Sequence, residues 1–145
     1  MGQTARKEGR IGSQMSTILI DHDIEGQAML LWAQISSEGW PDLFPIRFVR
    51  FDDVNLPYAS TDRAVWRFAQ QNAMILLTGN RNMKDADSLE QTIRDENRST
   101  SLPVLTVSNV ERMVHKDYRD RCEASLLEIV LYLENYRGAG RLFIP

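Results

Sequence analysis

The chain has 145 residues, of which 43% are hydrophobic and 26% are charged. This is the length of one ordinary domain, and the composition excludes intrinsic disorder over most of the chain. The formal net charge is −3, from 17 basic and 20 acidic residues. That balance argues against a dedicated nucleic-acid coat protein, because such proteins bind by neutralising phosphates. It still allows an enzyme that contacts nucleic acid through a small local patch.

The cysteine and histidine content excludes two kinds of site. Cys122 is the single cysteine, so the chain can form neither an internal disulfide nor a multi-thiolate metal centre. The two histidines, His22 and His115, are far apart in the sequence, which argues against a conventional zinc site. We expect Cys122 to be a buried thiol rather than a reactive one.

Residues 1–14 are predicted to be a flexible tail that precedes a single domain over residues 15–145. The tail contains Arg6, Lys7 and Arg10 but no apolar segment of the roughly 7–15 residues that a secretory signal requires. No apolar run in the chain approaches the ~20 residues of a membrane-spanning helix. We therefore expect a cytoplasmic protein that does not contact a membrane.

Apolar runs and helical patterns alternate along the first part of this domain. The run 18–20 is typical of a buried parallel strand. Residues 26–39 have apolar side chains three and four positions apart, which predicts an amphipathic helix that ends at Gly39, before a loop from Trp40. Residues 46–51 alternate apolar and basic side chains, which predicts a strand with one exposed face near a sheet edge.

The middle of the chain predicts a helix, a strand and a second helix. Ser60 or Thr61 is placed to cap the first helix, with Asp62 in its first turn. Residues 73–78 are the most continuous apolar run and predict a fully buried strand. A serine cap then begins a short helix over residues 88–94.

The last third predicts a strand over 103–107, a long helical region over 109–136 with a break near Asp117, and a final strand over 142–144. Strands that alternate with helices predict a three-layer α/β fold, with a Rossmann-like parallel sheet of four to five strands and flanking helices. With the strand order 2-1-3-4, the ends of the first and third strands are neighbours. Ligands bind at that position in such sheets.

Polar residues collect at these strand ends. Asp21 and Asp23 follow the first predicted strand, Asp62 opens a helix, and Thr78 ends the third strand. The residues after Thr78 add two amides and two carboxylates: Asn80, Asn82, Asp85 and Asp87. Oxygen donors without cysteine suit a hard cation such as Mg²⁺. The alternative is that these acidic residues cap helices and solvate loops.

Three segments of the chain share one order of motifs: 18–24 (Ile-Leu-Ile-Asp-His-Asp-Ile), 61–66 (Thr-Asp-Arg-Ala-Val-Trp) and 73–82 (Ala-Met-Ile-Leu-Leu-Thr-Gly-Asn-Arg-Asn). They resemble the small PIN-like domains, which are relatives of the toxin ribonucleases of bacterial toxin–antitoxin systems. The family pattern is a strand that ends in Asp, an Asp that opens a middle helix, and a strand that ends in Thr-x-Asp-x-Asp. The resemblance spans residues 17–107.

This resemblance implies a Mg²⁺- or Mn²⁺-dependent endoribonuclease. It makes Asp21 the central metal ligand, Asp62 a second acidic member of the site, and Thr78 the hydroxyl that supports it. Asn80 takes a catalytic and metal-binding position, but Asn80 and Asn82 stand where the nucleases carry Asp. An Asn oxygen can coordinate a cation, but it supplies no charge and cannot act as a base.

Two functions follow from the resemblance and stay open. The first is a toxin-like endoribonuclease with an antitoxin-like protein partner, in which Asp23, Asp85 or Asp87 compensates for the amides. The second is a catalytically impaired PIN-like module that binds a protein or RNA partner. A nucleotide-binding domain is disfavoured, because no G-x-G-x-x-G motif follows the first strand.

Further residues have two interpretations each. Four basic residues either contact RNA phosphates or form a solvated face: Arg63, Arg67, Arg81 and Lys84. His22 either acts beside Asp21 as a general acid or a phosphate contact, or it bonds to a backbone carbonyl. Trp66 lies off the apolar stripe of its helix, so it serves a homodimer interface or packs under a neighbouring helix.

Overall fold

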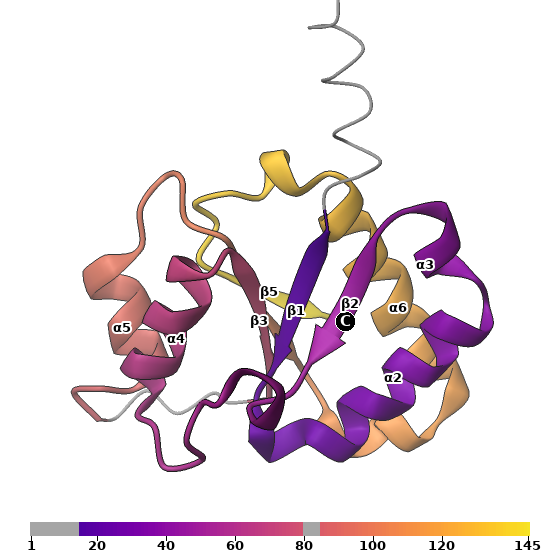
Figure 1. Ribbon diagram of the computed structural model, residues 1–145, viewed down its shortest axis with the longest axis horizontal. Coiled ribbons are helices and arrows are strands. Elements are labelled where there is room, and N and C mark those ends of the chain that lie inside the picture. The colour runs from indigo at the N-terminus through magenta and orange to yellow at the C-terminus, as the bar shows by residue number, and fades with distance from the viewer. Residues whose placement is uncertain (1–14, 80–84) are drawn as a thin grey trace, which may run out of the picture.

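The computed structural model of the protein describes residues 15–79 and 85–145. Within these residues the chain forms a five-stranded, all-parallel sheet in the order β2-β1-β3-β4-β5 (Figure 1). The strands are β1 (Ser16–Ile20), β2 (Ile46–Val49), β3 (Met74–Thr78), β4 (Val104–Val107) and β5 (Arg141–Ile144). This order confirms that the first and third strands are neighbours, and it places the alternating apolar and basic strand β2 at an edge.

The helices lie on both faces of the sheet. They are α2 (Glu25–Ser37), α3 (Trp40–Leu43), α4 (Asp62–Gln71), α5 (Leu89–Glu96) and α6 (Lys116–Leu131). Short 3-10 turns are η1 (His22–Ile24), η2 (Asp52–Val54), η3 (Val110–Val114) and η4 (Leu133–Asn135). In Figure 1, α4 and α5 lie on one side of the sheet, and α2 and α6 lie on the other. The predicted three-layer α/β, Rossmann-like fold is therefore confirmed.

Alternation along the strands divides the core into two clusters. Ile18 and Ile20 of β1 pack in one buried cluster with Leu31 of α2, whereas Leu19 packs in the other with Trp66 of α4. Successive side chains of a strand point to opposite faces, so a short apolar run without polar residues must be covered on both sides. The all-apolar run in β1 therefore requires helices on both faces.

The helix boundaries differ from the prediction by a few residues, and most clearly after Gly39. The loop expected from Trp40 is wrong, because Trp40–Leu43 forms the single turn of α3. Gly39 ends α2 with a φ of +84°, a backbone conformation that glycine adopts without strain. Pro41 then lies in the first turn of α3, where no helical hydrogen bond is lost. The break expected near Asp117 lies at His115, between η3 and α6.

Burial decides between the two interpretations of Trp66 and confirms that of Cys122. Trp66 is only 4% exposed and packs in the cluster under α4, so it is a core residue rather than a surface aromatic. Cys122 is completely buried in α6, and burial raises the pKa of its thiol to about 11. A thiol with such a pKa stays protonated at neutral pH and is a poor nucleophile.

Some predictions lie outside the described residues. These are the flexible tail at 1–14 and the site roles of Asn80, Arg81, Asn82 and Lys84, which stay predictions. Across the described ranges, no helix combines the length and the apolar character that crossing a membrane would need.

Candidate functional site at the ends of β1 and β3

Asp21 and Thr78 lie side by side where β1 and β3 end. The backbone N–H of Asp21 donates to the carbonyl of Leu77 at 2.9 Å, which continues the ladder between the two strands by one residue. The Thr78 hydroxyl then donates to Asp21 Oδ2 at 2.6 Å. The parallel register therefore brings these two predicted site residues into direct contact.

Asp21 is a carboxyl group in an unfavourable environment. Burial raises its pKa above the ordinary value, and the charges of Asp23 and Asp62 raise it further, while the Thr78 hydrogen bond acts in the opposite direction. Among the described residues, no Lys, Arg or His side chain forms an ion pair with Asp21. Its negative charge is consequently compensated by one hydroxyl and by a long contact from the backbone N–H of Asp23 at 3.4 Å.

Asp62 is placed by the start of α4. Thr61 caps this helix by accepting a hydrogen bond from the N–H of Ala64 at 3.1 Å, as one of the two predicted caps. Asp62 then lies in the first turn, and its Oδ2 accepts the N–H of Leu89 at 3.0 Å. Asp62 therefore joins the beginnings of α4 and α5 as well as facing the strand ends.

Two hollows meet at these carboxylates. A small one, of about 70 Å³, is lined by Asp21, His22 and Tyr58 among others. A larger one, of about 560 Å³, is lined by Asp85 and Asp87 among others. Asp23, Ser60 and Asp62 line both. The acidic residues singled out in the sequence therefore converge on one region.

The described residues supply two carboxylates toward the predicted metal site, without a closed set of protein ligands. In the ranges 15–79 and 85–145, no three His, Cys, Asp or Glu side chains gather closely enough to hold one ion. Asp21 and Asp62 supply two carboxylates, and Mg²⁺ is commonly held by one or two carboxylates with the remaining positions taken by water. The donor set therefore fits a hydrated Mg²⁺ or Mn²⁺ and does not fit a dedicated cage of protein ligands.

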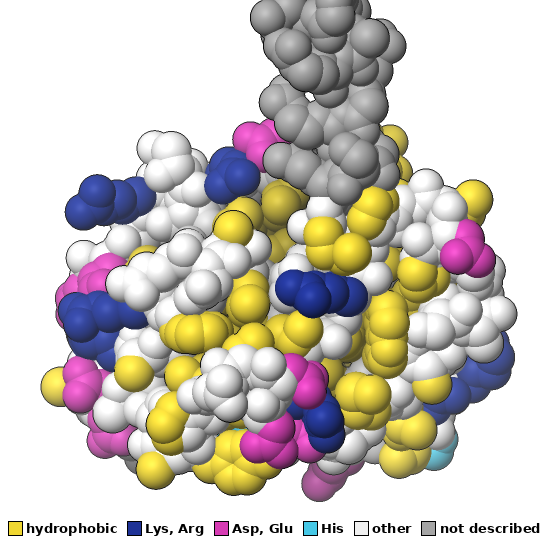
Figure 2. All heavy atoms as spheres, in the orientation of Figure 1, with side chains coloured by type: hydrophobic (Ala, Val, Ile, Leu, Met, Phe, Trp, Pro, Cys, Tyr) yellow, Lys and Arg dark blue, Asp and Glu magenta, His cyan; other side chains and the backbone are white. Residues whose placement is uncertain are grey.

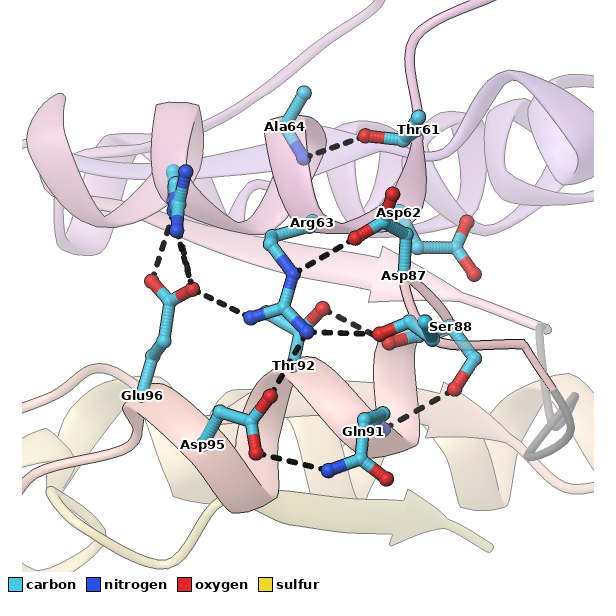
Figure 3. A network of polar contacts seen from close by, with 12 residues as sticks. Thr61, Asp62, Arg63, Ala64, Asp87, Ser88, Gln91, Thr92, Asp95 and Glu96 are labelled. Carbon is cyan, nitrogen blue, oxygen red and sulfur yellow. Dashed lines mark hydrogen bonds and ion pairs between the residues drawn. The ribbon is translucent and has the colours of Figure 1, made fainter.

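Arg63 lies within a network of acidic side chains beside this region (Figure 3). Its guanidinium forms ion pairs with Asp87 at 3.0 Å, Asp95 at 2.9 Å and Glu96 at 2.6 Å. The side chain of Arg63 is only 16% exposed. These hydrogen bonds raise the pKa of Arg63, and hydrogen bonds from Arg67 and Arg63 lower the pKa of Glu96 to about 2. Arg63 therefore binds α4 to α5 and holds the loop that carries Asp87.

Arg67 differs from Arg63 in its exposure. It pairs with Glu96 at 2.6 Å, but its side chain is 54% exposed and remains accessible to a phosphate. Of the four predicted RNA contacts, Arg63 is occupied by internal carboxylates, and Arg81 and Lys84 lie outside the described residues. The face of the molecule in Figure 2 mixes basic, acidic and hydrophobic side chains without an extended basic area.

The structure also shows an aromatic pair that the sequence did not predict. His22 stacks on Tyr58, with ring centroids 4.5 Å apart and an angle of 10° between the ring planes. His22 Nε2 also lies 3.2 Å from Asp23 Oδ1. The signal available in the sequence was a tyrosine in a polar loop after the second strand, which by itself says nothing about its neighbour.

Comparison with known proteins gives no further assignment. No family model matches the chain, and no curated protein and no solved structure is significantly similar to it. The Rossmann-like architecture therefore follows from the structure of this chain, and the resemblance to PIN-like domains stays a prediction from its motifs.

Proposed function

We propose that the chain is a PIN-like protein that hydrolyses RNA phosphodiesters with Mg²⁺ or Mn²⁺ bound at Asp21. The observation that carries this proposal is the environment of Asp21. It is a partly buried carboxylate that faces Asp23 and Asp62 and has no basic partner among the described residues. A divalent cation is a group that compensates such a charge.

Each residue of the proposed site would have its own role in hydrolysis. Asp21 and Asp62 would hold the cation, which when bound would activate a water and stabilise charge on the phosphate. The Thr78 hydroxyl keeps the Asp21 carboxylate in one orientation through its 2.6 Å hydrogen bond. Arg67 is the exposed basic residue of α4 and is available to a phosphate of the RNA backbone.

A second candidate function is a PIN-like module that binds a protein or RNA partner without cleaving it. Two observations favour it: Asn80 and Asn82 replace the acidic residues of the family pattern, and no three metal-binding side chains of the described residues lie close enough together to share one ion. The two functions differ in whether a cation binds and in whether RNA is cut.

The proposed function also implies a cellular location and a protein partner. We expect the protein in the cytoplasm, and as a toxin-like nuclease it would be held inactive by an antitoxin-like protein.

Cleavage of a labelled RNA with Mn²⁺ tests the proposal. The wild type should cut, and Asp21→Asn should cut roughly 100-fold more slowly or not at all, because it removes the charge that holds the cation. Asp42→Asn makes the same chemical change at an exposed position on α3 and should cut like the wild type. Cleavage by Asp21→Asn at the wild-type rate would refute the nuclease. Binding of RNA without cleavage would favour the module.

A further inference from the structure

We propose that Tyr58 and His22 form a stacking platform that binds an unpaired RNA base beside the carboxylates at the ends of β1 and β3. The inference rests on the proposed function, because it adds a base-binding position to that same site. The stacking geometry of the aromatic pair and its position beside the carboxylates support the inference.

The platform borders the proposed reaction centre. His22 directly follows Asp21, and the rings of His22 and Tyr58 line the same small hollow as Asp21 and Asp62. The two rings are stacked at 4.5 Å, and Tyr58 is 50% exposed. His22 therefore leaves half of Tyr58 accessible, and a further planar group can stack there. A base bound in this way would place its own phosphate near the carboxylates, whose charge the proposed cation would offset.

The platform is held rigidly. Phe51 is 2% exposed and lies beneath the pair, with ring centroids 5.8 Å from His22 and 6.4 Å from Tyr58. The Tyr58 hydroxyl donates to Asp52 Oδ2 at 2.7 Å. The ring of Tyr58 is held by aromatic contacts and its hydroxyl by a hydrogen bond, while half of the residue stays exposed. Such a side chain loses little conformational entropy on binding.

The charges around the platform favour a base over a phosphate as the group that stacks. Asp52 bonds to Tyr58, Asp23 pairs with His22, and Asp21 and Asp62 line the same hollow. These carboxylates repel an anion, whereas a nucleobase is neutral and presents a π-face. In a duplex the bases are already stacked on each other, so only an unpaired base can use the platform.

Binding of a fluorescein-labelled single-stranded RNA of about ten nucleotides tests the inference by fluorescence anisotropy. Ca²⁺ replaces Mn²⁺ in this assay, so that a cation with oxygen ligands is present during binding without the Mn²⁺ used for cleavage. The wild type should bind the single strand more tightly than a duplex of the same sequence. Tyr58→Ala and Tyr58→Leu should each weaken binding about tenfold or more, and Tyr58→Phe should retain it.

Tyr132→Ala is the matched control, because Tyr132 is 55% exposed and lies at the end of α6, outside the two hollows. Melting temperatures of all variants check that they fold. Equal binding by Tyr58→Leu, Tyr58→Ala and the wild type overturns the platform, and so does a wild type that binds no RNA or prefers the duplex.

The two proposals fail separately. If Asp21→Asn still cuts RNA while Tyr58→Ala binds it poorly, the metal-dependent nuclease is wrong and the platform stands. If cleavage needs Asp21 but binding does not need Tyr58, the platform alone is wrong. A role of the aromatic pair in contacting a protein partner would give this second result.

Discussion

Two groups of acidic residues lie near each other and have opposite surroundings. The arginine cluster consists of Asp87, Asp95 and Glu96 around Arg63. The strand-end cluster consists of Asp21, Asp23 and Asp62 at the ends of β1 and β3 and the start of α4. In the first, hydrogen bonds from Arg67 and Arg63 lower the pKa of Glu96. In the second, burial raises the pKa of Asp21.

The difference shows what each cluster contributes. A carboxylate whose pKa is lowered by its partners stabilises the folded state, and one whose pKa is raised costs stability when it is ionised. Residues that cost stability in this way are concentrated at functional sites, where a ligand supplies the missing partner. The arginine cluster is therefore a structural connection between α4 and α5, and the strand-end cluster is the candidate for binding.

The largest effect is expected from removing the basic residue of the arginine cluster. Arg63→Met leaves Asp87, Asp95 and Glu96 facing each other without their shared guanidinium. We expect a fall of several degrees in melting temperature by circular dichroism, because breaking a partly buried pair leaves charges uncompensated.

Arg67→Met is the matched control, because Arg67 contacts the same Glu96 but is 54% exposed. It should lower the melting temperature much less, as exposed ion pairs contribute little. Equal effects of the two substitutions would contradict the distinction between a structural arginine and a surface arginine.

The response to a divalent cation should distinguish the strand-end cluster from the arginine cluster. Mn²⁺ should stabilise the wild type by about 2.7 kcal/mol when its concentration is 100 times its Kd, because it binds the folded state alone. Asp21→Asn should abolish this gain, and in chelator it should melt slightly above the wild type, since it removes the ionised buried carboxylate. Thermal melts of both proteins with Mn²⁺ and with chelator give the comparison.

Asp42→Asn should respond to Mn²⁺ like the wild type, because Asp42 is an exposed residue of α3. Identical melts of the wild type and Asp21→Asn under both conditions would rule out a cation at Asp21.

The smallest effect is expected in the pH dependence of stability. The pKa of Glu96 is about 2 in the folded protein and 4.5 ordinarily, so its contribution is fully present above about pH 4.5 and is lost as the pH falls through 2. Glu96→Gln lacks this contribution at every pH. In urea unfolding at several pH values, its deficit relative to the wild type should shrink below pH 4.5. A deficit that stays constant there would show that Glu96 does not stabilise through its charge.

Much of the fold could be predicted from local patterns. An apolar run such as that of β3 (Met74–Thr78) must be covered on both faces, and the alternating residues of β2 (Ile46–Val49) suit an edge. The sequence offers Ser60 or Thr61 as one helix cap and Ser88 as another, because a side-chain oxygen there can accept an N–H three residues later. Thr61 and Ser88 do so. These features depend on residues close in sequence, so the sequence shows them directly.

The candidate site was predicted in part, for the same reason. Because parallel strands end at one edge of the sheet, the contact between Asp21 and Thr78 follows from the strand order. Asp62 was placed near them by its position at the start of a helix. Residues 80–84, which contain the two asparagines of the predicted motif, lie outside the described residues.

The amino-acid sequence by itself determined the alternation of strands and helices, their buried faces and their caps, because each is set by residues a few positions apart. The tertiary structure alone decided which charges and rings meet. Arg63 bonds to carboxylates 24 to 33 positions further along the chain because α4 packs against α5. Tyr58 stacks on His22 because the loop after β2 returns to the end of β1. Such contacts depend on how the helices and strands pack together, and no pattern of neighbouring residues predicts them.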